Sequence, residues 1–333
     1  MKRLSAIVVV AVMALSLIVL FALSLTGEKD FRKKYEGVDL DVFTSTAERE
    51  ASYSAYKALH AQKPIGKSDI TVKLDSFDAA ATRGVRLIED AKRTEEVLFT
   101  EEASSVTWTI TVPESGLYNI LVDYKSVPSR GVDMQRSILI NGEYPFYGAR
   151  RILFTRLWAD GGEVSTDNRG NQIRPRQLEV FDWNRSWAMD DLGYENEPYR
   201  FYLSQGTHRI TIEAENEPMI IGALTLKPAR MIPSYADYVA SKPAGAPKLE
   251  GINLKIQGEA SHLRSDPSLF AKYDRASAFT EPYSVWQNVL NYAGGDAWRT
   301  SGQWMEWTIE VPQTGWYQLS IKARQRFERG YIA

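Results

Sequence analysis

Hydrophobic and polar residues alternate along much of the chain between residues 68 and 228, and turn-forming residues separate the alternating runs. In SVTWTITV, residues 105–112, every second residue is apolar, which is the period of a strand with one buried face. Pro113 and Gly116 then interrupt the run, and the alternation resumes at residues 117–124. This order predicts an antiparallel hairpin.

The same alternation recurs in MQRSILINGEYPF, ARRILFTRLW, PYRFYLSQGTHRITIEA and MIIGALTLKP, and the first of these contains the hairpin-turn dipeptide Asn141-Gly142. Many short strands with turn signals and little helix predict an all-β fold, an antiparallel β-sandwich or jelly roll. We expect its core to include Trp108, Ile110, Val112 and Tyr118.

Part of the pattern occurs twice. The phrase W-T-I-x-V-P-x-x-G-x-Y begins at Trp108 and again at Trp307, 199 positions later. An earlier pair of Tyr-x-x-Tyr motifs, at residues 53–56 and 235–238, lies 182 positions apart. Each copy is therefore expected to open with a short helix that carries the Tyr pair and packs against its own sandwich, at about residues 47–61 and 234–240.

The repeat predicts the domain organisation. The expected parts are a signal peptide or membrane anchor (1–27), a juxtamembrane segment with a short helix (28–67), a first β-sandwich (68–229), a linker with a short helix (230–250) and a second β-sandwich (251–333). The second copy has no counterparts of residues 135–228. We therefore expect one complete and one truncated sandwich, the latter with an exposed apolar face, and a chain that is a fragment.

The N-terminus indicates export. Lys2 and Arg3 precede an uncharged run, residues 4–25, whose length suits a helix that spans a bilayer. A cleaved signal peptide and a retained anchor both remain open, because residues 22–24 offer a small-x-small cleavage site while the apolar run is long for a signal peptide. The expected location is extracellular or at the cell surface, with membrane contact only through this segment.

The order of the sequence motifs in the first copy resembles that of a known fold family. A strand ending W-x-x-x-V-P-x-x-G-x-Y, an Asn-Gly hairpin, YLSQGTHRITI and IGALTL are similar to the galactose-binding-like jelly roll of carbohydrate-binding modules of the family 6/35 type. INGEYPF, LFTRLW, DNRGNQIRPRQ and EPYSVW…GGDAW…GQWMEW further resemble the tandem N-terminal region of bacterial extracellular solute-binding proteins of carbohydrate ABC transporters. That resemblance implies a transporter permease as partner, through a C-terminal domain missing from this chain.

The composition limits the kinds of binding and catalysis that we expect of this chain. A net charge of −2 gives no reason to expect nucleic-acid binding, and the absence of cysteine excludes disulfides and thiol nucleophiles. The three histidines lie in no metal-binding or nucleophile motif, so we expect no enzyme and no cofactor. The family resemblance leaves a structural calcium site near Asp75, Asp78 and Glu259 as one further hypothesis.

The long polar segment from Trp158 to Trp187 is the candidate binding site for a polysaccharide or oligosaccharide. Sugars present flat C–H faces and hydroxyl edges, which suit exposed aromatic rings beside planar hydrogen-bonding groups. The candidate residues are Trp158, Asn168, Arg169, Asn171, Arg174, Trp183 and Trp187. The alternative is that the tryptophans belong to the core and that the arginines only pair with nearby aspartates.

Three classes of function remain open: a glycan-binding module of a sugar-uptake system, a structural stalk that presents another domain at the cell surface, and an accessory module of a secreted glycoside hydrolase. The sequence does not name the sugar.

Overall fold

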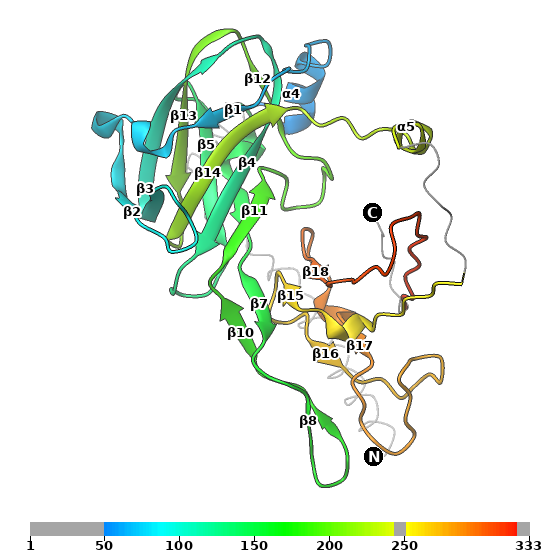
Figure 1. Cartoon of the computed structure of the whole chain (residues 1–333). Coiled ribbons are helices and arrows are strands. Elements are labelled where there is room, and N and C mark those ends of the chain that lie inside the picture. Colours follow the sequence, from blue (N-terminus) through cyan, green and yellow to red (C-terminus); the bar gives the residue numbers. More distant parts are fainter. Residues whose placement is uncertain (1–49, 243–250, 325–333) are drawn as a thin grey trace, which may run out of the picture. The chain divides into compact units, whose positions relative to one another are not determined.

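The computed structural model describes residues 50–242 and 251–324, and their regular structure is mainly antiparallel β-strand (Figure 1). The helices are α4 (Tyr53–Leu59) and α5 (Tyr235–Ala240). The strands are β1 (Ile70–Val72), β2 (Arg83–Ile88), β3 (Val97–Val112), β4 (Gly116–Ser126), β5 (Met134–Ile140), β6 (Ile152–Phe154), β7 (Leu157–Asp160), β8 (Ser165–Thr166), β9 (Gln172–Ile173), β10 (Gln177–Val180), β11 (Trp183–Trp187), β12 (Arg200–Leu203), β13 (Gly206–Ala214), β14 (Met219–Pro228), β15 (Leu263–Arg264), β16 (Ala271–Lys272), β17 (Tyr292–Ala293) and β18 (Met305–Glu306).

The signal peptide or anchor predicted at residues 1–27 lies outside the described residues. Among the residues that the structure describes, no helix is both long and apolar enough to cross a membrane.

The predicted antiparallel sandwich is confirmed. Hydrogen bonds connect its strands in the order β11-β4-β14-β3-β13-β5-β6, and β1, β2 and β12 pair with β14, β3 and β4. The antiparallel hairpin predicted from the first repeat phrase is wrong, because β3 and β4 do not pair with each other. Within the described residues β3 pairs with β13 and β4 pairs with β14, so the turn at residues 113–115 carries the chain from one layer to the other. Both faces of this fold therefore depend on strands about 100 residues apart, which is why the sequence pattern alone does not show the pairing.

Strand β3 belongs to both layers of the sandwich. Its first part, at residues 98–100, pairs with β14, and its second part, at residues 105–112, pairs with β13. Between the two parts lies Ala103, which has a φ of 58° and is exposed. A left-handed backbone at a non-glycine residue is uncommon and costly, and here it redirects the strand from one layer to the other.

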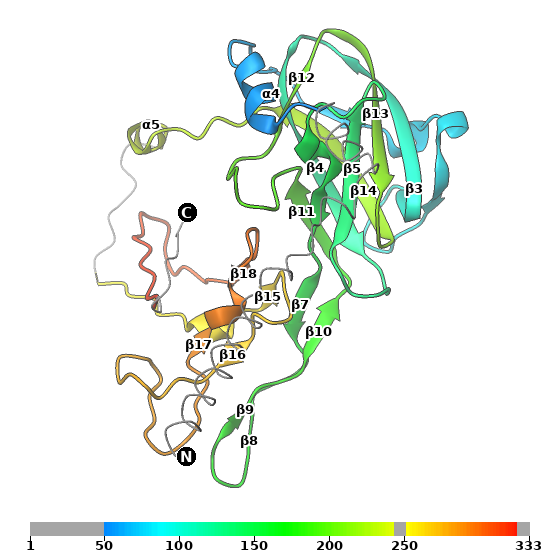
Figure 2. The ribbon, with the colours of Figure 1, turned by 180° about the vertical axis from the view of Figure 1, so that it is seen from behind.

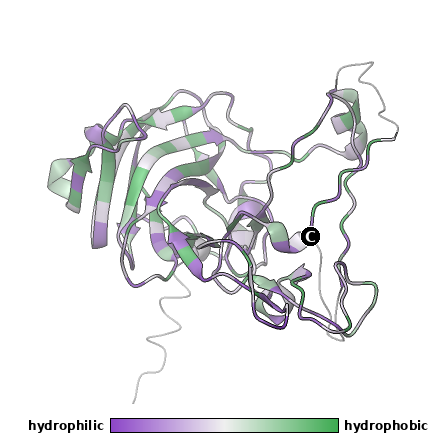
Figure 3. Cartoon of the chain, turned by 60° about the horizontal axis from the view of Figure 1, so that its bottom comes forward, coloured by the Kyte–Doolittle hydropathy of each residue, from purple (hydrophilic) through white to green (hydrophobic). Residues whose placement is uncertain are grey.

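The core lies between these layers. Trp108 and Tyr118 are fully buried, and Ile110 and Val112 are buried with them, as the alternation predicted. Figure 3 shows both hydrophobic and hydrophilic residues on the strands of the sandwich, and in β4 every residue except Lys125 is buried. Burial of the apolar side chains between the layers supplies the main stabilising contribution to such a fold.

Helix α4 is held against the sandwich by its two tyrosines. Ser52 caps the helix by accepting a hydrogen bond from the backbone of Ala55. The hydroxyl oxygens of Tyr53 and Tyr56 accept the backbone N–H groups of residues 200 and 202 on β12, at 3.0 and 2.8 Å. The predicted short helix is therefore present, and its Tyr-x-x-Tyr spacing matches successive outward N–H groups of a strand.

Helix α5 repeats the capping but not the packing. Ser234, which lies 182 positions after Ser52, accepts a hydrogen bond from the backbone of Asp237. Tyr235 is 83% exposed, whereas Tyr238 contacts the ring of Trp316. The expected equivalence of the two Tyr pairs thus extends to the helix but not to its contacts, because residues 251–324 contain no strand equivalent to β12.

The second copy of the repeat phrase forms no hairpin. Residues 307–324 contain no named strand, and the only regular strands of residues 251–324 are β15 to β18, each of two residues. Ile309 and Leu319 are exposed. The physical reason is the lack of counterparts of β13 and β14 within the described residues, since a strand forms only when a neighbour accepts its hydrogen bonds.

Strand β15 joins instead to the first copy. A four-stranded sheet has the order β10-β7-β15-β18, in which Arg264 of β15 is paired with Trp158 of β7. The buried guanidinium of Arg264 donates to both carboxylate oxygens of Asp160, at 3.2 Å, and to Oε1 of Gln177, at 2.9 Å. This ion pair connects two stretches of chain about 100 residues apart.

Candidate functional site

The candidate segment, residues 158–187, leaves the sandwich through β7 and returns through β10 and β11, with the β8–β9 hairpin between them (Figure 2). Strands β7 and β10 pair over residues 157–160 and 177–180, and β11 pairs with β4. The segment is therefore organised by backbone pairing at both ends.

Arg156 fixes the point at which the segment begins. Its guanidinium is fully buried and forms ion pairs with Glu217, which is also fully buried, and with Glu179 of β10. A further hydrogen bond runs to the hydroxyl of Ser129, at 2.6 Å. Charged groups are stable at such depth only when they are paired in this way, so the start and the end of the β7–β10 pair are held to the sandwich.

The tip of the β8–β9 hairpin is ordered by Asp167. Its Oδ1 accepts the backbone N–H groups of Arg169 and Asn171, both at 2.8 Å, and its Oδ2 accepts Nδ2 of Asn171 at 2.9 Å. These hydrogen bonds, chiefly that from the Asn171 side chain, lower the pKa of Asp167. The turn leaves Asn168 and Arg169 exposed to solvent.

Residues 287–290 dock against the same hairpin. The backbone of Gln172 donates to the carbonyl of Asn288 at 2.8 Å, and the backbone of Asn288 donates to Oδ1 of Asn171 at 2.9 Å. The backbone of Leu290 donates to Oε1 of Gln172 at 2.7 Å. Asn171 and Gln172 therefore serve as hydrogen-bonding partners for a distant stretch of the same chain.

Gly170 permits this close approach. It has a φ of +77°, and a Cβ at this position would lie 2.2 Å from Nε2 of Gln287. The Gln287 side chain thus rests directly on the turn beside Arg169. No residue with a side chain would fit here without displacing Gln287.

Trp286, the neighbour of Gln287, is 88% exposed. An indole with so large an exposed fraction is unusual, because Trp is mostly buried in proteins. Trp286 directly precedes the docked residues 287–290, and the Gln287 side chain donates a hydrogen bond to the carbonyl of Arg169. On the hairpin side the exposed groups are Asn168 and Arg169. We define these residues together with Gln287 as the hairpin surface. The sequence pattern did not single out Trp286, because its proximity to the hairpin depends on long-range pairing.

Two other candidate residues contact residues 251–324. Trp158 lies at the centre of the four-stranded sheet, paired with both Glu179 and Arg264. The guanidinium carbon of Arg174 lies 3.4 Å from the ring centroid of Phe270, a cation–π contact. The backbone of Trp158 and the side chain of Arg174 therefore have partners within the chain.

Trp183 has partners on the sandwich itself. Its Nε1 donates to Oδ1 of Asp90 at 3.1 Å, and the guanidinium of Arg93 lies 4.2 Å from the centroid of its ring. A Cβ at Gly222 would lie 2.4 Å from the indole, so the ring packs directly on the β14 backbone. A sugar could stack on Trp183 only where Arg93 and Gly222 leave its surface free.

The carboxylate beside Trp183 is held in its charged form. The ammonium of Lys125 lies 2.6 Å from Oδ2 of Asp90, and this hydrogen bond lowers the pKa of Asp90 to about 2. Trp187, on the same strand as Trp183, is half-buried and pairs with Leu121 of β4. These contacts place Trp183 beside a network of ion pairs on the sandwich.

Among the described residues, the structure shows no set of ligands that would support the hypothesis of a calcium site. Asp78 caps Ala80 through Oδ1 and pairs with Arg209 through Oδ2, at 3.1 and 3.4 Å. Across residues 50–242 and 251–324, no three His, Cys, Asp or Glu side chains come together as metal ligands.

No family model matches this chain, and no curated protein matches it. The chain is similar to solved structures of carbohydrate-binding modules. One is a family 35 module from Clostridium thermocellum, at 15% identity over 49% of this chain and 100% of the module, with a TM-score of 0.29. Another is the C-terminal family 6 module of a marine laminarinase, LamC, from Zobellia galactanivorans, at 16% identity over 48% and 99%, with a TM-score of 0.30.

A third similar structure is an enzyme that carries such a module. It is a β-(1,4)-mannanase with a family 35 module from Podospora anserina, at 12% identity over 50% of this chain and 29% of the enzyme, with a TM-score of 0.28. At these scores the neighbours do not identify a ligand or an activity for this chain. Its function is therefore inferred from its own residues.

Proposed function

We propose that this chain is a non-catalytic, extracytoplasmic carbohydrate-binding protein and that a polysaccharide or oligosaccharide binds at the hairpin surface. The observation that carries the proposal is the 88% exposed indole of Trp286 beside the exposed Asn168 and Arg169. A flat aromatic ring can cover the C–H face of a pyranose, while amide and guanidinium groups reach its hydroxyl edge.

The backbone around this surface is already ordered. Asp167 fixes the turn that carries Asn168 and Arg169, and the hydrogen bond from Gln172 to Asn288 fixes the backbone just after Trp286. Preorganisation reduces the entropy lost on binding, so a shallow surface with few contacts can still hold a glycan.

The remaining candidate residues have a supporting part in this proposal. Asn171 and Arg174 hold residues 270 and 288 against the segment, and Trp158 lies in the sheet that continues the hairpin. For Trp183 and Trp187, direct contact with a glycan stays a prediction of the sequence.

The wider setting is also a proposal. The resemblance of its sequence motifs to tandem modules of solute-binding proteins favours a part in sugar uptake with a transporter permease. An accessory module of a secreted glycoside hydrolase is the second candidate, and the mannanase that carries a family 35 module is compatible with it. A stalk without ligand would share the fold but not the binding.

Affinity electrophoresis of the whole chain in gels containing β-glucan, mannan, xylan or galactan tests the proposal. We expect one polysaccharide to retard the wild type, and Trp286→Ala to weaken that retardation about ten- to a hundredfold, the effect of about 1–3 kcal/mol for an aromatic anchor. Tyr194→Ala is the matched control, because Tyr194 is 85% exposed and lies outside the hairpin surface. Equal retardation of Trp286→Ala and the wild type would refute this surface, and no retardation by any glycan would favour the stalk.

A further inference from the structure

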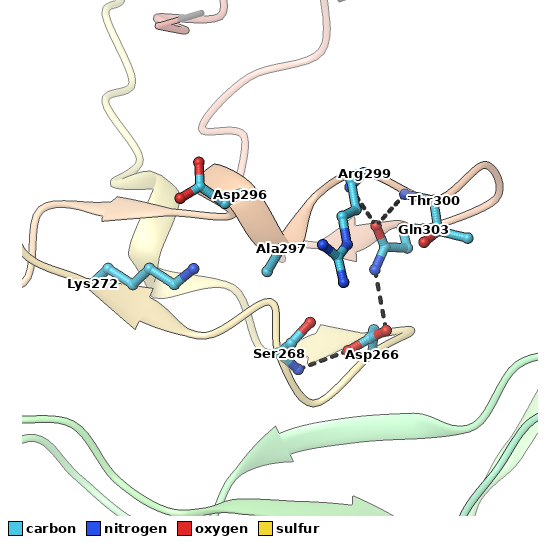
Figure 4. A pocket seen from close by; sticks show the side chains of 8 residues that line it. All are labelled: Asp266, Ser268, Lys272, Asp296, Ala297, Arg299, Thr300 and Gln303. Atoms are coloured by element: carbon cyan, nitrogen blue, oxygen red, sulfur yellow. Dashed lines mark hydrogen bonds between the residues drawn. The ribbon is translucent and has the colours of Figure 1, made fainter. Parts of the chain in front are cut away.

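A second potential binding site is lined by residues between 266 and 303. It is an open pocket of about 390 Å³, which falls within the range of small-molecule sites. Its lining residues are Asp266, Ser268, Lys272, Asp296, Ala297, Arg299, Thr300 and Gln303. Figure 4 shows these side chains between two stretches of chain, residues 266–272 and residues 296–303.

The walls of the pocket are joined by Gln303. Its Oε1 accepts the backbone N–H groups of Arg299 and Thr300, at 2.9 and 3.0 Å, and its Nε2 donates to Oδ2 of Asp266 at 3.1 Å. The other oxygen of Asp266 accepts the backbone N–H of Ser268 at 2.7 Å. One amide side chain thus connects both stretches and shapes the pocket.

Several polar groups in the pocket have hydrogen-bonding capacity left. Within residues 50–242 and 251–324, the guanidinium of Arg299 and the hydroxyls of Thr300 and Ser268 have no hydrogen-bond or ion-pair partner. Figure 4 shows the Arg299 guanidinium directed between the two stretches. The ammonium of Lys272 donates to the carbonyl of Gly294 at 2.6 Å and has further protons to donate.

The lining selects a class of ligand. Only Ala297 is apolar, so an apolar molecule would gain little from entering. Lys272 and Arg299 are balanced by Asp266 and Asp296, so the pocket offers no net charge to an anion or a cation. What remains is a set of donors and acceptors at short range, which matches the hydroxyl groups of a neutral sugar.

We propose that this pocket binds one residue of a neutral saccharide, as the end of a glycan chain or in a short soluble oligosaccharide. Arg299 donates to neighbouring hydroxyl or ring oxygens, and the Thr300 hydroxyl completes the contact. This inference deepens the proposed function and rests on it. The hairpin surface binds the flat face of a sugar ring, and the pocket binds the terminal residue of the glycan chain.

Isothermal titration calorimetry on the whole chain tests the pocket. The probes are neutral tetrasaccharides of glucose, mannose, galactose and xylose, a galacturonate tetrasaccharide and inorganic phosphate. We expect one neutral tetrasaccharide to bind, and Arg299→Ala and Thr300→Val each to weaken it, the first about tenfold or more because a charged donor is lost. Arg275→Ala is the control, since Arg275 is exposed in the same region but does not line the pocket.

The outcomes separate the pocket from the hairpin surface. If a polysaccharide retards the wild type but not Trp286→Ala, and no soluble tetrasaccharide binds, the pocket proposal alone fails. Binding of phosphate or galacturonate in preference to neutral sugars would also overturn it, as would equal affinities of Arg299→Ala and Arg275→Ala. If neither affinity electrophoresis nor calorimetry detects binding of any saccharide, both the pocket proposal and the proposed function are refuted.

Discussion

The indole Nε1 of Trp307 donates a hydrogen bond to the carbonyl of Gly258, at 3.2 Å. Gly258 is the first residue of a 3-10 helix, residues 258–260. In the first copy, the indole of Trp108 donates at the same distance to Leu74, again the first residue of a 3-10 helix, residues 74–76. The second copy thus keeps this contact although it forms no sandwich.

The repeated tyrosine behaves in the same way. The hydroxyl of Tyr118 donates to the carbonyl of Glu114 at 3.1 Å, and that of Tyr317, 199 positions later, donates to Gln313 at 2.6 Å. Contacts that span four residues are retained in both copies, whereas contacts that need a partner strand are present only in the first.

The two repeat tryptophans should therefore differ in their effect on stability. Trp108→Ala empties a fully buried site and should lower the free energy of unfolding of the sandwich by about 3–5 kcal/mol. Trp307 is only half-buried, so Trp307→Ala should leave the main unfolding transition unchanged. Urea denaturation of both variants measures this, and a comparable loss in each would show that the second copy stabilises the first.

Trp183 should behave as a packing residue in stability measurements. Trp183→Ala removes the contacts with Gly222 and Asp90 and should cost about 2 kcal/mol or more. Gly222→Ala should cost a comparable amount, because its Cβ would collide with the indole. Trp286→Ala, at an exposed site, should change the melting temperature little. An unchanged melting temperature for Trp183→Ala would instead indicate a ring held ready for ligand.

Replacement of Arg264 should loosen residues 251–324 without unfolding the sandwich. Arg264→Ala leaves Asp160 without its buried partner, and losing one member of such a pair costs about 3 kcal/mol. Hydrogen exchange should become faster at β15 and at residues 287–290, while β3 and β13 keep their protection. Arg275→Ala, an exposed arginine of the same region, serves as the control. Uniformly faster exchange in β3 as well would show that the two parts unfold together.

Stability should fall as the pH rises from about 4 to 6. Burial, reinforced by the charge of Asp266, raises the pKa of Asp133 to about 6, above the value of about 3.9 for an unfolded chain. Between these values the folded state keeps a proton that the unfolded state releases, so the contribution of Asp133 is present at low pH and is lost through this window, up to about 3 kcal/mol.

Asp133→Asn tests this contribution by urea denaturation at pH 4 and pH 7. The variant should lose less stability than the wild type over that interval, whereas Asp75→Asn, at an exposed carboxylate, should follow the wild type. Asp90, whose pKa is lowered to about 2 by Lys125, titrates below this range and does not obscure the comparison. If the free energies of unfolding of Asp133→Asn and the wild type change equally between pH 4 and pH 7, the predicted contribution of Asp133 is wrong.

The sequence was informative where structure is local. The period of two around Trp108 predicted the strand and its buried face, and the Tyr-x-x-Tyr motif predicted helix α4. The pattern did not predict contacts between residues about 100 positions apart, such as Arg264 with Asp160 or Asn171 with Asn288. The motifs EPYSVW and GQWMEW contain Trp286 and Gln303, but they did not mark either residue as part of a binding site, because the hairpin surface and the pocket depend on long-range contacts.

The β7–β15 pairing also limits how the protein can be divided for experiments. An expression boundary near residue 230 would follow the sandwich and would give a protein with a complete hydrophobic core. That protein would keep Asn168 and Arg169 but lack Trp286 and the whole pocket, and the β7 edge would have no β15 neighbour. A glycan screen on such a truncated protein would thus return a false negative, even though the protein is well folded.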